Sequence, residues 1–290
     1  MLKRAGLYER VKGSWLYDAY WSIADRRLIE QRRQEVDFFR KTLVGFRRND
    51  LIFDIGANHG LKTRIFIELG ARVIAVDPDG SNQKTLTERF LAYRLRKKPV
   101  IVVGKAVSDQ NGHETFWVSE PGFEMNTLNP KWVETLGKDS ARFGRTFQFR
   151  EKRQVETVTL EQMISSYGLP FYIKIDVEGY EPNVLKGLQT AVPYLSFEVN
   201  LPDFRSEGEQ CIARLREIAP HGVFNCAAGN RLVFSEWVSH DNFAMVFPEI
   251  PETSVEVFWR TQIPKAMPLG RAARIERSGG KRFSDRARHC

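Results

Sequence analysis

Four residues at alternating positions have types suited to holding a nucleotide-like ligand. They are Asp54, Gly56, Asn58 and Gly60, and they follow the apolar run Leu51–Phe53. A buried parallel strand has such a continuous hydrophobic run, and glycine, which lacks a Cβ, lets the backbone turn tightly near a ligand. A helical pattern begins at Leu61 and stops at Gly70. We therefore expect a strand, a glycine turn and a helix around a ligand at the carboxyl edge of a parallel sheet.

Asp77 ends the next apolar run, Arg72–Val76, 21 positions after Gly56. An acidic side chain there can accept hydrogen bonds from both ribose hydroxyls of NAD or of S-adenosylmethionine. A dinucleotide fingerprint needs G-x-G-x-x-G, whereas the spacing here is D-x-G-x-N-x-G. The acidic Asp54 would repel a pyrophosphate and suits a cationic ligand, which favours S-adenosylmethionine. Taken alone, Asp54 could also be a helix cap or a turn residue.

Ser108 and Asp109 follow the third predicted strand, at the place where an adenine base would lie. A short acidic side chain could accept a hydrogen bond from the exocyclic amine of adenine. The same two residues could equally start a turn. Asn111–Gly112 is a strong tight-turn signal, and it predicts a hairpin within Ala106–Val118.

The exit of the fourth predicted strand, Lys174–Glu181, carries four charged residues among eight. Such charges at the end of an otherwise buried strand would be costly without a purpose. Lys174 and Asp176 alternate onto one face, and Glu178 begins the turn beyond. Strand ends on this side of a sheet surround the ligand crevice, so we expect Lys174 on the substrate side. The alternative is an internal ion pair between Lys174 and a carboxylate.

Strands alternate with helices along most of the chain, which predicts an α/β fold with a Rossmann-like, doubly wound and mostly parallel sheet. We expect strands at 51–53, 72–76, 99–103, 155–160, 171–175, 194–199, 223–227 and 243–247, and helices at 61–69, about 79–95, 160–167, 182–188 and 207–218. The predicted organisation is an N-terminal helical extension at 1–49, a domain at 50–259 with an insertion at about 119–150, and a tail at 260–290.

The predicted insertion has no clear period and is interpreted as a substrate loop or a lid. Trp117, Phe123 and Trp132 could stack on a sugar face or line an apolar pocket there. They could equally be ordinary core beneath a long loop.

The positive charge of the chain is concentrated at its C-terminal end. The formal net charge is +8, and the residues from Arg260 onward hold nine Lys or Arg and two acids. The rest is nearly neutral, with 35 basic and 34 acidic residues, so we expect no specific nucleic-acid partner. The tail is predicted to be disordered, with at most a weak contact to an anionic surface.

Other bulk features point to a globular protein of a reducing compartment. No apolar run approaches the roughly 18 residues of a membrane span, and the basic N-terminus lacks the apolar core of a secretory signal. The three cysteines, Cys211, Cys226 and Cys290, are too scattered for a disulfide framework or a zinc site. We therefore expect a cytoplasmic protein; its oligomeric state is left open.

Several of these segments together resemble one known family. D-I-G-A-N-H-G at 54–60, A-V-D-P at 75–78, A-V-S-D at 106–109 and I-K-I-D-V-E-G-Y-E at 173–181 are similar to the FkbM-type methyltransferases. The resemblance covers roughly residues 35–200 and implies a class I methyltransferase fold that uses S-adenosylmethionine, typically to methylate a hydroxyl of a sugar or natural product. It assigns Asp54, Gly56 and Asn58 to the donor loop. It also assigns Asp77, where many members have Glu, to the ribose, and Asp176 and Glu178 to the active-site edge.

Methyl transfer to an alcohol benefits from a general base, because the hydroxyl is a poor nucleophile until its proton leaves. The candidates are Glu178, Asp176 and His59. Glu178 leads because it lies in the loop beyond the strand, whereas Asp176 more readily orients Lys174 or the donor ammonium. His59 has a suitable ordinary pKa, but donor contact or solvent exposure fits it as well.

Glu198 and Asn200, at the fifth strand exit, could bind acceptor hydroxyls or cap the next turn. Asp176, Glu178 and Glu198 could offer oxygen ligands to a metal, but no spacing demands one, so none is predicted.

The sequence therefore favours an S-adenosylmethionine-dependent methyltransferase that modifies a hydroxyl of a glycan or a small-molecule secondary metabolite. The first alternative is an NAD-type oxidoreductase, which the glycine spacing disfavours. The second is a non-catalytic Rossmann binding module that its basic tail tethers to nucleic acid or membrane.

Overall fold

The computed structural model describes residues 26–91, 93, 100–138, 144 and 146–261. Most of the predicted N-terminal extension, and the predicted tail beyond Thr261, lie outside the described residues. Within the described part, no helix is long and apolar enough to cross a membrane.

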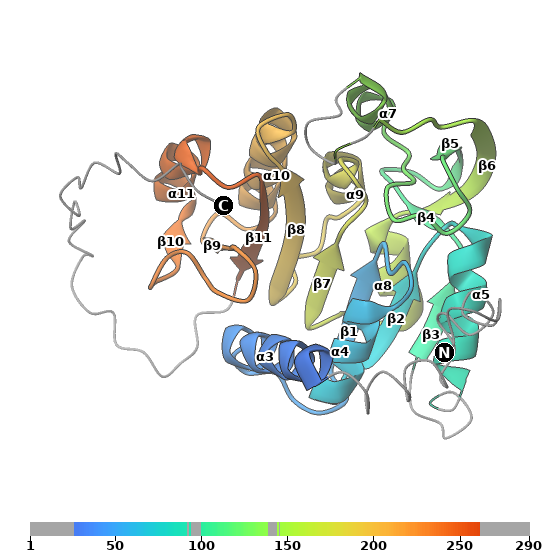
Figure 1. The fold of residues 1–290 in the computed structure, drawn as a ribbon. Coiled ribbons are helices and arrows are strands. Elements are labelled where there is room, and N and C mark those ends of the chain that lie inside the picture. Colours follow the sequence, from blue (N-terminus) through green and yellow to red (C-terminus); the bar gives the residue numbers. More distant parts are fainter. Residues whose placement is uncertain (1–25, 92, 94–99, 139–143, 145, 262–290) are drawn as a thin grey trace, which may run out of the picture.

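The core of the molecule is an eight-stranded sheet in the order β10-β9-β11-β8-β7-β1-β2-β3 (Figure 1). Its strands are β1 (Leu51–Ile55), β2 (Arg72–Val76), β3 (Val100–Val103), β7 (Tyr172–Ile175), β8 (Tyr194–Asn200), β9 (Val223–Ala227), β10 (Val238–Ser239) and β11 (Ser254–Arg260). The five strands from β8 to β3 are parallel, and β11 runs antiparallel between β8 and β9. This confirms the predicted α/β, mostly parallel sheet of class I methyltransferase type. The sheet reverses its strand order between β1 and β7, and ligands bind at such a switch point.

Helices cover both faces of this sheet, as a doubly wound fold requires. Helices in the described part of the chain include α3 (Arg26–Thr42), α4 (Leu61–Leu69), α5 (Gly80–Arg89), α7 (Pro130–Lys138), α8 (Leu160–Tyr167), α9 (Glu181–Lys186), α10 (Arg205–Ile218) and α11 (His240–Val246). One face packs against α3 and α4 through a cluster that includes Phe39, Phe66 and Tyr172. The other packs against α8, α9 and α10 through a larger cluster. The strands between them are buried on both faces, which explains their continuous apolar runs.

A smaller three-stranded sheet, in the order β4-β6-β5, adjoins the carboxyl edge of the main sheet. Its strands are β4 (Ala106–Val107), β5 (Gly112–Val118) and β6 (Glu151–Val158). The hairpin predicted within Ala106–Val118 is wrong, because β4 and β5 both pair with β6 and not with each other. The Asn111 side chain accepts a hydrogen bond from the Thr159 N–H, so it bonds to the neighbouring strand exit.

The strand predicted at 243–247 is also wrong, because this apolar run forms most of α11 and enters a short 3-10 helix, Phe247–Glu249. Ser239 caps α11 by accepting a hydrogen bond from the Asn242 N–H. The missing strand is β11, and it includes Arg260, which the sequence had assigned to the tail. At the other end of the chain, α3 confirms helical structure within the described part of the N-terminal extension.

Candidate active site

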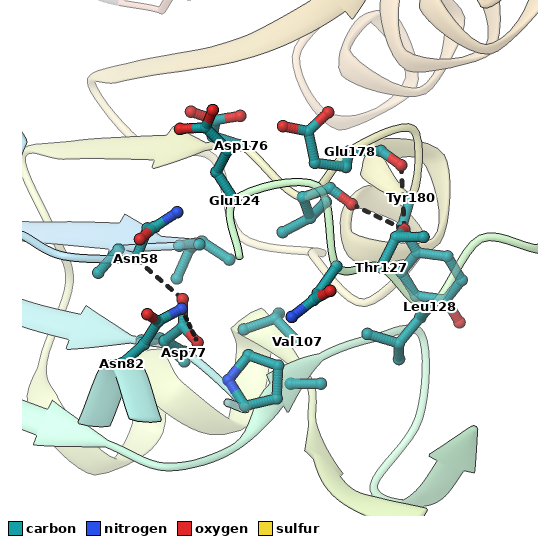
Figure 2. A pocket seen from close by; sticks show the side chains of 18 of the residues that line it. Asn58, Asp77, Asn82, Val107, Glu124, Thr127, Leu128, Asp176, Glu178 and Tyr180 are labelled. Atoms are coloured by element: carbon teal, nitrogen blue, oxygen red, sulfur yellow. Dashed lines mark hydrogen bonds between the residues drawn. The ribbon is translucent and has the colours of Figure 1, made fainter. Parts of the chain in front are cut away.

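A cavity of about 430 Å³ opens where β1, β2, β7 and β8 end, at the switch point of the sheet. Its walls come from the turn after β1, the end of β2, the turn after β7 and the segment 123–128 of the predicted insertion. Figure 2 shows two groups of polar side chains, with Asn58, Asp77 and Asn82 at one end and Glu124, Asp176 and Glu178 at the other. Its volume lies within the roughly 300–1,000 Å³ of typical ligand pockets.

The turn after β1 depends on a glycine at position 56. Gly56 has a φ of +77°, and a Cβ added there would lie 1.7 Å from the backbone oxygen of Asp176. No other residue type fits, because both the positive φ and the close approach require the absence of a side chain. The N–H groups of Gly56 and Ala57 both donate to the Val76 carbonyl at 3.0 Å. Gly56 thereby fixes the turn against the exits of β2 and β7.

The carboxylate of Asp77 is hydrogen-bonded to both other members of the first polar group. Its Oδ2 accepts from the Asn58 N–H at 2.8 Å, and its Oδ1 accepts from the Asp79 N–H at 2.9 Å and from Asn82 Nδ2 at 3.1 Å. Burial raises the pKa of Asp77 to about 6, although these hydrogen bonds act in the opposite direction. The amide oxygens Oδ1 of Asn58 and Asn82 are buried and have no hydrogen-bond partner among the described residues. They are acceptors without donors at the cavity wall.

Asp54 and Lys174 lie inside the sheet, beneath the cavity and outside its lining. They occupy neighbouring register positions of β1 and β7. Thr63 donates to the Asp54 carboxylate, and burial raises the pKa of Asp54. Lys174 Nζ is 2.7 Å from Asp176 Oδ2. This matches the internal ion pair that the sequence left open, and Lys174 itself does not reach the substrate side.

Lys174 is surrounded by carboxylates, and this decides its charge. Burial acts to lower the pKa of Lys174, but the carboxylates of Asp176, Glu256 and Asp54 outweigh it, so the pKa is raised. The ammonium in turn keeps the pKa of Asp176 below its ordinary value against the effect of burial. Asp176 therefore stays ionised where its side chain reaches the cavity.

The second polar group contains carboxyl groups whose affinity for protons is increased. Burial and the neighbouring carboxylates of Asp176 and Glu198 raise the pKa of Glu178 well above its ordinary value. Burial, with Asp176, raises the pKa of Glu198 to about 7. Glu124, from the insertion, lines the same end of the cavity. Carboxyl groups with raised pKa values in a cleft are typical of general bases.

The turn that carries Glu178 is strained and held from two sides. Glu178 has a φ of +55°, a conformation that costs a residue with a side chain about 1–2 kcal/mol. Glu181 Oε1 accepts from the N–H groups of Val177 and Gly179 at 3.1 and 3.3 Å. From the insertion, Thr127 Oγ1 donates to the Glu178 carbonyl at 3.0 Å and Asn129 Nδ2 donates to the Gly179 carbonyl at 2.5 Å. The turn is thus fixed by its own helix and by the insertion.

Several predicted site residues do not line the cavity. Gly60 packs against Leu86 and Phe90 at the start of α4, and Asn200 lies beyond the cavity at the end of β8. Ser108 is buried, and its hydroxyl bonds to the Glu114 carboxylate and to the Tyr180 hydroxyl. Asp109 is exposed. The wall predicted for adenine contact is formed instead by the apolar residues Pro78, Ala106, Val107 and Phe116.

The remaining predicted residues do come together. Gly56, Asn58, His59, Asp77, Asp176, Glu178 and Glu198 all line the cavity. Of the three aromatic candidates, Phe123 lines the cavity, whereas Trp132 is fully buried against Phe204 and Trp117 packs under Lys152. In the described part of the chain, no group of three or more His, Cys, Asp or Glu has a geometry suited to a metal ion.

Sequence reasoning missed Asn82, Thr127 and Asn129. Asn82 is the third residue of α5, where nothing in the local pattern marks a binding residue. Thr127 and Asn129 are in the segment interpreted only as a loop or lid, since contacts between distant segments leave no local signal. Glu181 was visible as the last acid of D-V-E-G-Y-E, but its bonds to the turn were not.

The sequence matches the family model described as "Methyltransferase FkbM domain" over residues 54–217, more than half of the chain. The chain belongs to the FkbM methyltransferase family. It is a methyltransferase whose methyl donor is S-adenosylmethionine, and the NAD-type and non-catalytic alternatives are therefore set aside. A comparison of the sequence with curated proteins gave no match.

Solved structures similar to this FkbM-family chain include other methyltransferases. One is the SAM-dependent methyltransferase from Agrobacterium tumefaciens, with a TM-score of 0.40, 11% identity, and coverage of 79% of this chain and 62% of that one. Another is the precorrin-6Y C5,15-methyltransferase from Geobacter metallireducens, with a TM-score of 0.40, 8% identity, and coverage of 77% of this chain and 84% of that one. A third is an O-methyltransferase from Bacillus cereus in complex with SAH, with a TM-score of 0.36, 10% identity, and coverage of 80% of this chain and 81% of that one. This chain thus spans less than two thirds of the length of the first.

The residues present fit S-adenosylmethionine. The unpartnered amide oxygens of Asn58 and Asn82 can accept hydrogen bonds from an adenosine, and Gly56 lines the same cavity. The ionised Asp176 suits the ammonium and sulfonium charges of the donor. The apolar wall beyond Asp77 suits a base.

Proposed function

We propose that this methyltransferase modifies a hydroxyl oxygen of a carbohydrate or of a hydroxylated secondary metabolite. The observation that carries the proposal is the position of Glu178 at the end of the cavity away from Asp77, on a turn held in a strained conformation (Figure 2). Its side chain has no hydrogen bond or ion pair within the described part of the chain, so it is available to a substrate. Glu124 and Glu198 line the same end and can accept hydrogen bonds from further hydroxyls.

The chain's own contribution is alignment and proton removal. S-adenosylmethionine supplies an activated methyl group on a sulfonium. Asp77 and the turn at Gly56 bind and orient the adenosine end of the donor. Alignment of the reacting atoms within about 3–3.5 Å gives the main part of the rate enhancement. Glu178 takes the proton of the acceptor hydroxyl, a step that typically contributes about 10²- to 10⁴-fold. Its raised pKa makes it a stronger base than an exposed glutamate.

Donor binding is tested first, by calorimetry with S-adenosylhomocysteine. We expect binding by the wild type, loss of binding in Asp77→Ala, and no binding of NADH. An extract from cells that lack the gene is then incubated with the purified protein and donor carrying a deuterated methyl group. Tandem mass spectrometry identifies the labelled product and the atom that carries the label.

The proposal requires label on the oxygen of a polyhydroxylated molecule. Glu178→Gln should reduce the labelling rate by about 10²-fold or more while S-adenosylhomocysteine affinity changes by less than about threefold. Glu209→Gln, which changes an exposed carboxylate on α10, is the matched control and should label at the wild-type rate. Label on nitrogen or carbon, or full activity of Glu178→Gln, contradicts the proposal.

A further inference from the structure

The side chain of Asn82 has an unusual environment at the donor end of the cavity. It lies on α5, lines the cavity and is only 3% exposed. Its Oδ1 is buried and has no hydrogen-bond partner among the described residues. A buried acceptor left without a donor loses its hydrogen bonds to water without replacement, so such groups are rare unless a ligand completes them.

The orientation of this amide is fixed by its neighbours. Asn82 Nδ2 donates to Asp77 Oδ1 at 3.1 Å, which turns Oδ1 away from Asp77. Gly122 lies over Oδ1, and a Cβ added there would be 3.2 Å from it. The Gly122 N–H is itself held by Asp79 Oδ2 at 3.0 Å. Because residue 122 is a glycine, it places no side chain against the Asn82 oxygen.

The hydrogen-bonding capacity of Asp77 shows why a second acceptor is needed. A carboxylate offers about four lone-pair sites. Asp77 Oδ1 already accepts two hydrogen bonds and Oδ2 accepts one, all from the protein. About one site is left, which serves one hydroxyl of a cis-diol but not both. The sequence predicts that Asp77 accepts hydrogen bonds from both ribose hydroxyls, but the one remaining site allows only one of them.

We propose that Asn82 is a donor-binding residue whose Oδ1 accepts a hydrogen bond from one ribose hydroxyl of S-adenosylmethionine, while Asp77 accepts from the other. The pair Asp77–Asn82 takes over the role of one longer acidic side chain. This inference rests on donor binding and not on the acceptor, so it can fail while the proposed O-methylation holds, and the reverse is also true.

The test is a calorimetric double-mutant cycle between the protein and the ligand. S-adenosylhomocysteine and its 2′-deoxy and 3′-deoxy analogues are titrated into the wild type, Asn82→Ala and Asn82→Ser. Each deoxy analogue should bind the wild type about tenfold more weakly than the parent. Asn82→Ala should bind the parent about tenfold more weakly and should no longer distinguish one of the two analogues from it. Asn82→Ser gives a second folded variant should the alanine variant be unstable.

Lys84→Ala, which changes an exposed side chain on the same helix, is the matched control and should reproduce the wild-type affinities. The inference is overturned if the Asn82 variants bind all three ligands more weakly by the same factor.

An analogue that lacks the adenine amine provides a further check. If the Asn82 variants lose discrimination only against that analogue, Oδ1 contacts the base and the inference is also wrong. If the wild type binds no S-adenosylhomocysteine, both this inference and the donor assignment fail.

Discussion

Carboxyl groups around the cavity differ in their affinity for protons because their neighbours differ. Asp176 is kept ionised by Lys174, whereas Glu178 and Glu198 face other carboxylates and hold protons more tightly. Asp77 accepts hydrogen bonds from three protein donors and lies at the end of the cavity where we propose that the adenosine binds. The sequence shows these residues only as acids at strand ends. The donor-binding, charge-fixing and proton-accepting roles that we propose for them rest on burial and on hydrogen-bond and charge partners.

The raised pKa of Asp77 predicts a pH dependence of donor binding. The ionised carboxylate accepts from a ribose hydroxyl better than the protonated one, and its pKa in the free protein is about 6. The affinity for S-adenosylhomocysteine should therefore rise from pH 5 to pH 7, by up to about tenfold per pH unit below pH 6, and then level off. Calorimetry at fixed ionic strength measures this. A flat profile from pH 5 to 7 would show that Asp77 does not change its protonation on binding.

At the scale of elements, the sequence predicts the strands that carry the site and misses the segments that complete it. The strands β1, β2, β7 and β8 are buried on both faces, so each leaves an apolar run ending in a polar residue. The run at 243–247 has the same composition but is a helix, because short apolar runs do not distinguish the two. In strand β11, the buried residues Val255, Val257 and Trp259 stand at alternating positions. This alternation indicates a strand, although none was predicted there.

The insertion contributes in a way that no local pattern reveals. The segment 122–129 bonds to Asp79 through Gly122 and Asn126, and to the turn of Glu178 through Thr127 and Asn129. It therefore connects the Asp77 end of the cavity to the Glu178 end.

Thr127→Val tests this tie, because valine keeps the shape and removes the hydroxyl that bonds the Glu178 carbonyl. We expect methyl transfer to slow by roughly 10- to 100-fold, since small misplacements of reacting groups are costly, with donor affinity within about threefold of the wild type. The Gly179 amide should also exchange its hydrogen faster. Thr115→Val, which removes a hydroxyl that bonds Gln154 on the small sheet, serves as control. Unchanged transfer and exchange rates in Thr127→Val would assign the insertion no positioning role.

For the molecule as a whole, the site imposes a cost in stability that grows with pH. Burial raises the pKa of Asp77 to about 6, of Glu198 to about 7 and of Glu181 to about 8. Between about pH 5 and 8 the folded chain therefore keeps protons that the unfolded chain has released. Because the folded state then binds more protons than the unfolded state, the free energy of unfolding falls as pH rises.

Glu181→Gln isolates the largest of these contributions. A glutamine keeps the single oxygen that accepts from Val177 and Gly179, and it removes the titrating proton. Urea unfolding at pH 5, 6, 7 and 8 should show the free energy of the wild type decreasing with pH. The variant should lose stability less steeply, by about 1.4 kcal/mol per pH unit, and exceed the wild type at pH 8. Glu134→Gln is the matched control, because Lys138 lowers the pKa of that exposed carboxylate and it does not titrate in this range. Equal slopes for Glu181→Gln and the wild type would mean that Glu181 is ionised throughout, and that the turn of Glu178 is held by a charged carboxylate.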